Sequence, residues 1–457
     1  MTYLQYEGAA FLRQRLLLST LTGQPVRISN IRATASALSM PGLRPYEASL
    51  LRLLCKVTVG SSVHVDTTGT VLTYVPGQLL GNDDESPDRL THACHASRGI
   101  SYYLEVLLLL APFCKNPLSI TLTGVTDGAP ADLSVDLTRS VTVPTLQHLL
   151  VLVSNRGGGG GAPALTFDVK LVRRGFPPAG GGEVSVQCSG VLAGALQPFA
   201  LVETGRVKRV RGVAFAENMS PLLARRCINR IRHVFNAFLP DVWVYLDVKK
   251  KAKNGKSVEQ PTAAAAENKA RRGMGVALVA ETIKGNVKGA AAFAHSQASE
   301  EDEKRNDQDA AAADAYRATG NCKLAKLLEA EAKELQRKGS AGDANAAASS
   351  EAGNELGGSE QMGDDVAHRL LLEIMQGGVV DTNHQYMALL FAAAADEHQP
   401  SKLRLSRLTP YTTQFLRHLR DFLGVTFHFE EKADSETPEV LLKCVGVGLR
   451  NTARKTF

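Results

Sequence analysis

The sequence RRGFPPAGGGEVSV at residues 173–186 contains the signals on which the fold prediction depends. Pro177 and Pro178 restrict the backbone, whereas the three glycines at 180–182 allow conformations that a β-carbon would forbid. The alternating run EVSV that follows indicates a β-strand. The stretch therefore predicts the end of one strand, a sharply bent connection and the start of another strand, either at a sheet edge or at a ligand-facing turn.

Upstream of this stretch, an apolar helical run followed by strand-like runs occurs three times. These helical runs cover residues 45–57, 100–113 and 145–153. The runs after them alternate between apolar and polar residues, as strands with one buried face do. The repetition predicts a large domain of the α/β class, whose first part spans residues 1–187 and contains three related α/β units.

Downstream, the chain changes character before it returns to the large domain. Ser220 and Pro221 suit the N-cap and the first turn of a helix that lies between strand-like runs. We therefore predict a smaller α/β domain at residues 188–295, inserted into the large domain. The large domain is expected to resume over residues 364–457, with a helix pair, whose second helix covers residues 410–423, and two strands.

Two segments have compositions that argue against a packed core. Lysine and alanine dominate residues 249–272, which predicts a mobile cationic loop within the inserted domain. Residues 296–363 are rich in alanine, serine, glycine and acidic side chains, and a segment of that composition is expected to be mostly disordered.

Positive charge is concentrated at the start of the inserted domain. Residues 203–232 hold eight basic and two acidic residues, a net charge of +6 that equals the net charge of the whole 457-residue chain. Such a stretch suits a polyanionic partner such as RNA, although an ordinary solvated surface has the same composition.

Composition and length also disfavour several kinds of protein. Hydrophobic residues make up 44% of the chain, enough for a packed core, and the longest apolar run is far shorter than the roughly 20 residues of a membrane helix. The N-terminus does not resemble a signal peptide. The seven cysteines form no CxxC pair and suit a reducing compartment, so we expect neither a membrane span nor a metal site.

Several motifs occur in an order that resembles the RNA 3′-terminal phosphate cyclase family, and most closely its cyclase-like branch. Besides residues 173–186, they are LRxxLxLS at 12–19, PVRISNIR at 25–32, PGLRPYEAS at 41–49, QGGVVD at 376–381 and the C-terminal CVGVGLRNTARK. The resemblance implies a large domain of repeated units similar to the C-terminal domain of translation initiation factor three, with a smaller inserted α/β domain.

The resemblance also implies what an active cyclase would need. Such an enzyme activates an RNA 3′-phosphate with ATP through a covalent histidine–AMP intermediate, and its histidine stands in a Leu-His-x-x-Thr pattern. Residues 408–412 are instead Leu-Thr-Pro-Tyr-Thr, so Thr409 occupies the nucleophile position and suits a helix N-cap. The positions implied to line the nucleotide site also differ, and they are Glu105, Asn383, Tyr386 and Met387. We therefore expect no ATP cofactor, and an active cyclase with a displaced nucleophile is a remote alternative.

Arginines are retained where the resemblance implies contact with RNA phosphates. A guanidinium group suits this role because it binds phosphate oxygens bidentately, but some of these side chains could instead pair with carboxylates. The RNA- or phosphate-binding candidates are Arg13, Arg32, Arg44, Arg173 with its neighbour Arg174, Arg206, Lys208, Arg209 and Arg211.

An endoribonuclease that cleaves pre-rRNA at a spacer boundary is the main alternative function. Cleavage requires a base, an acid and a cation, and Arg417, Arg420 and Asp421, with His418 between them, supply these types on the last predicted helix. Adjacent residues on a helix point in different directions. We therefore favour a solvated helix face that carries all four polar side chains.

The resemblance thus implies a non-cyclase ribosome biogenesis factor of the small-subunit processome. Its implied partners are pre-rRNA, a large nucleolar GTPase and other processome proteins. Nuclear and nucleolar localisation, and a monomeric state within that large complex, follow from the same resemblance.

Overall fold

The structure is a computed structural model. It describes residues 2–34, 41–82, 90–129, 131–154, 165–178, 180–192, 194–248, 273–294, 352–431 and 439–450. The predicted Lys/Ala-rich loop at 249–272 lies outside these residues, as does the low-complexity segment up to residue 351. No helix in the described ranges is long and apolar enough to cross a membrane.

The chain begins with a unit of the order β-α-β-α-β-β. Its elements are β1 (Leu4–Glu7), α1 (Leu12–Thr22), β2 (Val26–Ser29), α2 (Pro45–Val57), β4 (Ser62–Val65) and β5 (Leu72–Val75). The sheet order is β1-β2-β5-β4, in which only β1 and β2 are parallel. A two-stranded sheet of β3 (Thr58–Val59) and β6 (Gln78–Leu79) lies beside it in the chain.

A second unit repeats this order. Its elements are β7 (Leu90–Ala93), α3 (Ile100–Leu110), β8 (Leu118–Gly124), α5 (Val143–Val153), β9 (Phe167–Arg173) and β10 (Gly182–Cys188), with three single turns, η1 (Ala111–Phe113), α4 (Val135–Leu137) and η2 (Thr138–Thr142). The sheet order β7-β8-β10-β9 matches the first unit, again with one parallel pair at its start.

The third unit is split by the inserted domain. It consists of β11 (Ala200–Leu201), α11 (Gln385–Ala394), β16 (Pro400–Leu405), α12 (Pro410–Leu423), β17 (His428–Glu431) and β18 (Val440–Val445). The sheet order β11-β16-β18-β17 is the same once more. The prediction of repeated α/β units is therefore right in kind, but only two units lie within residues 1–187. Helices α2 and α5 are the second helices of their units, and the prediction took them for the first.

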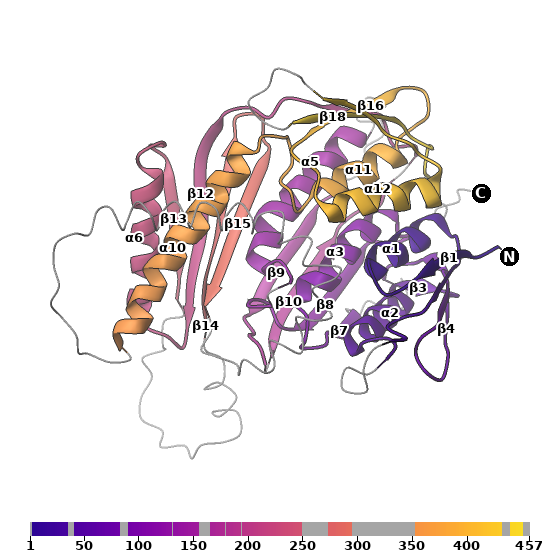
Figure 1. The fold of residues 1–457 in the computed structure, drawn as a ribbon, viewed down its shortest axis with the longest axis horizontal. Coiled ribbons are helices and arrows are strands. Elements are labelled where there is room, and N and C mark those ends of the chain that lie inside the picture. The colour runs from indigo at the N-terminus through magenta and orange to yellow at the C-terminus, as the bar shows by residue number, and fades with distance from the viewer. Residues whose placement is uncertain are drawn as a thin grey trace, which may run out of the picture.

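The inserted domain has a different strand order. Its elements are β12 (Val207–Glu217), α6 (Pro221–Phe235), β13 (Val242–Asp247), β14 (Gly273–Thr282), β15 (Val287–Ala294) and α10 (Ala352–Met375). The order is β13-β12-β14-β15, and α6 and α10 lie together on one face of this sheet (Figure 1). Ser220 caps α6 through its side chain, and Pro221 is the first helical residue, as predicted.

Helix α10 corrects the predicted domain boundary at residue 364. Val366, Ala367 and Leu370 are fully buried with residues of α6 and the sheet, so they complete the core of the inserted domain. The helix also begins at residue 352, inside the segment predicted to be mostly disordered. The large domain therefore resumes after residue 375, and α10 is one of the two helices that the structure describes in the inserted domain.

The core of the large domain is helical. Every residue of α3 and of α11 is buried, so these helices have no solvent-facing side. Helix α1 contacts α3 and α12, and α11 contacts α5 and α12. Helices from all three units thus pack against one another, which places the N-terminus of α12 next to buried side chains of the first two units.

Candidate functional site

Thr409 is the N-cap of α12, as predicted. Its side-chain oxygen accepts a hydrogen bond from the backbone N–H of Thr412 over 3.1 Å, and Pro410 is the first helical residue. Its hydroxyl also lies 2.8 Å from the hydroxyl of Thr412, which in turn donates to Oε1 of Gln385. None of these neighbours is a base that could remove the Thr409 proton, so its hydroxyl serves the helix and is not activated as a nucleophile.

An ion pair fills the space next to this cap. The guanidinium of Arg13 on α1 lies 3.0 Å from the carboxylate of Glu105 on α3, and both side chains are buried. Arg13 lies over the ring of Tyr102 and donates to the hydroxyl of Tyr411, which donates to Glu105 over 3.3 Å. Arg13 and Glu105 also line, with Tyr386 and five other residues, a cavity of about 10 Å³, whereas small-molecule sites measure about 300–1,000 Å³. The space suits about one water molecule and is too small for a nucleotide.

Two histidines nearby are held within the protein. His384 is fully buried, with Nδ1 on the carboxylate of Asp381 and Nε2 2.6 Å from the hydroxyl of Thr142. Both ring nitrogens are therefore engaged by side chains of the large domain.

His418 corrects the prediction that it faces solvent. It is fully buried, its Nδ1 donates to Oε1 of Gln14 over 2.9 Å, and its Nε2 accepts from Arg15 and Gln414. Burial, with further contributions from Arg15 and Arg417, lowers the pKa of His418 to about 3. The imidazole is therefore neutral at physiological pH and cannot act there as a general acid.

The remaining nuclease candidates lie on the outer side of α12, as predicted. Arg417, Arg420 and Asp421 are all exposed. Arg417 donates to Gln414, whereas Asp421 accepts a hydrogen bond from the hydroxyl of Tyr6 over 3.2 Å. Burial and then Asp421 raise the pKa of Tyr6, so this hydroxyl keeps its proton near neutral pH. The contacts are those of a helix that packs against β1, and they do not assemble a base, an acid and a cation around one point.

Two of the predicted phosphate-binding arginines bind carboxylates of the protein itself. Arg13 is buried against Glu105, which corrects the prediction that it faces RNA. Arg32 binds Glu47 with both terminal nitrogens, at 2.9 and 2.8 Å, and Glu47 also accepts from the backbone N–H of Arg44 at the start of α2. Arg32 thus pairs with a carboxylate of the protein, which was the alternative to phosphate binding. Arg44 is half-buried and Arg173 is exposed.

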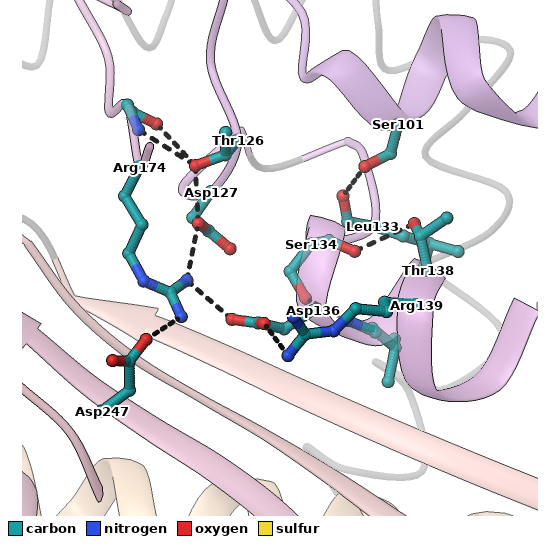
Figure 2. Close-up of polar contacts among 12 residues, drawn as sticks. Ser101, Thr126, Asp127, Leu133, Ser134, Asp136, Thr138, Arg139, Arg174 and Asp247 are labelled. Atoms are coloured by element: carbon teal, nitrogen blue, oxygen red, sulfur yellow. Dashed lines mark hydrogen bonds and ion pairs between the residues drawn. The ribbon is translucent and has the colours of Figure 1, made fainter. Parts of the chain in front are cut away.

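Arg174 lies in the joint between the second unit and the inserted domain, not on an RNA-facing surface. Its guanidinium is 2.6 Å from Asp136, 3.3 Å from Asp127 and 2.9 Å from Asp247 of β13 (Figure 2). Its Cζ atom also lies 3.8 Å from the centre of the Phe215 ring on β12. The side chain is almost fully buried. One arginine therefore bridges two carboxylates of the large domain and one of the inserted domain.

This joint contains a buried carboxylate whose charge is incompletely satisfied. Asp127 is buried, and its Oδ1 has no hydrogen-bond partner. Burial raises the pKa of Asp127 to about 6, against the opposing effect of Arg174 and with a further rise from Asp136. Within the described residues, no group of three or more His, Cys, Asp or Glu side chains is placed to hold a metal ion.

The glycine-rich stretch forms the sharp connection between β9 and β10, as predicted. Gly180 and Gly181 have φ angles of 64° and 72°, in the left-handed region. A β-carbon on Gly175 would lie 2.2 Å from the backbone nitrogen of Gly182, which leaves no room for a side chain. Phe176 in this connection stacks on Phe215 with ring centroids 5.9 Å apart. The turn therefore contacts the inserted domain.

The basic residues of β12 have mixed environments. Arg206 and Lys208 are exposed, whereas Arg209 pairs with Glu281 at 2.6 Å and Arg211 pairs with Asp241 at 2.7 Å. Both pairs are partly exposed, and such pairs contribute about 0–1 kcal/mol. Arg209 and Arg211 can therefore exchange these carboxylates for other anions at small cost.

Sequence reasoning missed the aromatic side chains of the neighbouring strand. Trp243 and Tyr245 on β13 are 62% and 60% exposed. The signal was present in VWVYLD at residues 242–247, where aromatic residues occupy alternate positions and therefore share one face of a strand.

Comparisons with known proteins agree with these motifs. The model of the family described as "RNA 3′-terminal phosphate cyclase" matches residues 4–429. The "RNA 3′-terminal phosphate cyclase-like protein" of Homo sapiens is 36% identical over 456 residues, which cover 99% of this chain and 97% of that protein. The "rRNA processing protein rcl1" of Schizosaccharomyces pombe is 36% identical over 281 residues, 62% of this chain and 68% of that protein. The chain thus belongs to the RNA 3′-terminal phosphate cyclase family, in its cyclase-like branch.

Proposed function

We propose that this chain is a non-cyclase ribosome biogenesis factor that binds precursor rRNA during small-subunit rRNA processing. The observation that supports the proposal lies where the resemblance implies a nucleotide: Thr409 caps a helix, and the cavity beside the Arg13–Glu105 pair measures only about 10 Å³. A member of this family that lacks an ATP site still has the family fold, and this fold can bind RNA without catalysing a reaction. The name of the Schizosaccharomyces pombe relative supports rRNA processing as the context.

The finer parts of this proposal come from the family resemblance. They are membership of the small-subunit processome as a monomer, a direct contact with a large nucleolar GTPase, and nuclear and nucleolar localisation. The similarity of the repeated units to the C-terminal domain of translation initiation factor three is likewise inferred from the family resemblance. We assign the RNA-facing surface to the basic residues at the start of β12 and directly before it, of which Arg206 and Lys208 are exposed.

Incubation with labelled ATP is expected to give no covalent AMP adduct. The Thr409→His variant is expected to give none either, because restoring the imidazole does not reopen the space that Arg13 and Glu105 fill. An active cyclase in the same assay serves as the positive control. A histidine-linked AMP adduct on the unmodified chain would overturn the proposal in favour of an active cyclase.

RNA affinity is expected to fall as salt rises, and to fall further when Arg206 and Lys208 are both replaced by glutamate. Each lost phosphate contact should reduce the slope of log K against log salt by about 0.7 for a single strand. Fluorescence anisotropy with a labelled precursor fragment measures both quantities.

The matched control reverses two charges elsewhere, at Lys115 and Lys402, which are exposed on the large domain. These changes should leave most of the affinity in place. An equal loss in both double variants would remove β12 from the proposed surface. Cleavage of the fragment that the Asp421→Ala change abolishes, in a variant that remains folded, would replace this proposal with the endoribonuclease.

A further inference from the structure

The inserted sheet has two faces, and they differ in what covers them. Helices α6 and α10 cover one face (Figure 1), and Val210, Val244 and Leu278 are buried in the same cluster as residues of these helices. On the opposite face, Val279 of β14 packs against Leu137 and other residues before α5. The large domain therefore covers the β14 side of this second face.

The β12–β13 side of the second face presents aromatic side chains to solvent. Trp243 and Tyr245 lie on either side of the buried Val244 in the strand, so both project to the face that the helices do not cover. More than half of each side chain is accessible, at 62% and 60%. Tryptophan is usually well buried, and two large aromatic side chains exposed side by side indicate a binding surface.

Basic side chains lie directly beside these rings. The strand register pairs Trp243 with Arg211, and Arg209 lies two residues away on the same face of β12. The guanidinium of Arg232 on α6 lies 5.9 Å from the centre of the Trp243 ring. Arg209 and Arg211 are paired with Glu281 and Asp241, but these pairs are partly exposed, so a phosphate can replace the carboxylates at small cost. The aromatic pair is therefore bordered by basic side chains that suit a negative partner with flat apolar groups.

We propose that the face formed by Trp243 and Tyr245 stacks unpaired bases of single-stranded RNA while Arg209 and Arg211 contact its phosphates. The proposal rests on the RNA-binding function above and names the kind of RNA and the residues that hold it. Four-stranded sheets that expose aromatic side chains stack two or three bases in this way, and the stacking tolerates many sequences because every base has a flat face. A duplex would not fit, because its bases are already stacked on each other.

The chain offers a direct probe, because Trp243 is its only tryptophan. A short unstructured RNA of mixed sequence should quench the tryptophan fluorescence of the full chain as it binds. The same RNA annealed to its complement should leave the fluorescence almost unchanged. Trp243→Ala should weaken single-strand affinity about tenfold or more, measured by anisotropy of labelled RNA, and Trp243→Phe should restore most of it. The salt dependence should stay the same in both variants, since neither changes a charge.

The control is Phe429→Ala, which removes another exposed aromatic side chain, 52% accessible, from a strand of the large domain. It should leave affinity and quenching unchanged, and circular dichroism should show that each variant melts like the parent chain. If the chain binds RNA with the expected salt dependence but Trp243→Ala has no effect and no quenching occurs, this inference fails and the proposed function stands. That outcome would point to a protein partner on the aromatic face. If no RNA binds at all, both fail.

Discussion

The Arg174→Leu variant is expected to lose about 3–5 kcal/mol of unfolding free energy, because it leaves three carboxylates facing one another without their shared cation. In the native joint, Asp127 and Asp136 of the large domain and Asp247 of the inserted domain all bind this guanidinium within 3.3 Å (Figure 2). Leucine fills part of the volume but offers no charge. Chemical denaturation followed by circular dichroism measures the loss.

The neighbouring residue provides the control for this change. Arg173 precedes Arg174 in the chain but is exposed, so Arg173→Leu should change stability by no more than about 0.5 kcal/mol. Arg174→Lys should recover only part of the loss, since a single ammonium cannot meet three carboxylates with the geometry of the guanidinium fork. Equal stabilities for the Arg173 and Arg174 variants would show that the cluster does not hold the two domains together.

The cost of Arg174→Leu is also expected to depend on pH. The pKa of Asp127 in the folded protein, about 6, is above its ordinary value of 3.8, so folding favours the protonated form. This acid therefore contributes most to stability below pH 3.8, and its contribution is lost as pH rises towards 6. Without Arg174 the largest effect that opposes the rise is lost, so the carboxylate should take up its proton at still higher pH. The difference between variant and parent should thus be smaller at pH 5 than at pH 7.5.

The elements that could be predicted from the sequence are those with local signals. Thr409-Pro410 and Ser220-Pro221 each combine a capping side chain with a proline that suits the first turn, and both helices begin there. The turn before β10 follows from prolines and glycines that restrict or free the backbone. In each case the deciding interaction lies within four residues, so its residues are adjacent in the sequence.

The features that could not be predicted depend on residues far apart in the chain. His418 resembles a solvent-facing helix residue until Gln14 and Arg15, about 400 positions earlier, supply its partners. In the sequence Arg13 resembles a phosphate-binding residue, and only the fold brings Glu105 next to it. The predicted boundaries of the repeated units were wrong for another reason. Strands β1 and β2 have four residues each, too few to show a period, whereas the long apolar α2 stands out.

Glu105→Gln is expected to destabilise the chain by about 3–5 kcal/mol, because it keeps the shape of the side chain but leaves the buried Arg13 guanidinium without the carboxylate 3.0 Å away. The double variant Arg13→Met with Glu105→Leu should recover most of this loss, since apolar side chains of similar volume can replace a buried pair at little cost. Denaturation of the two single variants and the double variant gives the coupling energy as a double-mutant cycle.

The double variant also separates two roles for Arg13. If the guanidinium only neutralises Glu105, the refolded double variant should bind RNA with the same affinity and the same salt slope as the parent chain. If Arg13 reaches an RNA phosphate, the salt slope should fall by about 0.7 even though stability is restored. The burial of Arg13, with 6% of its side chain exposed, favours the first result. Arg13 would then contribute to the packing of α1 against α3 and not to RNA binding.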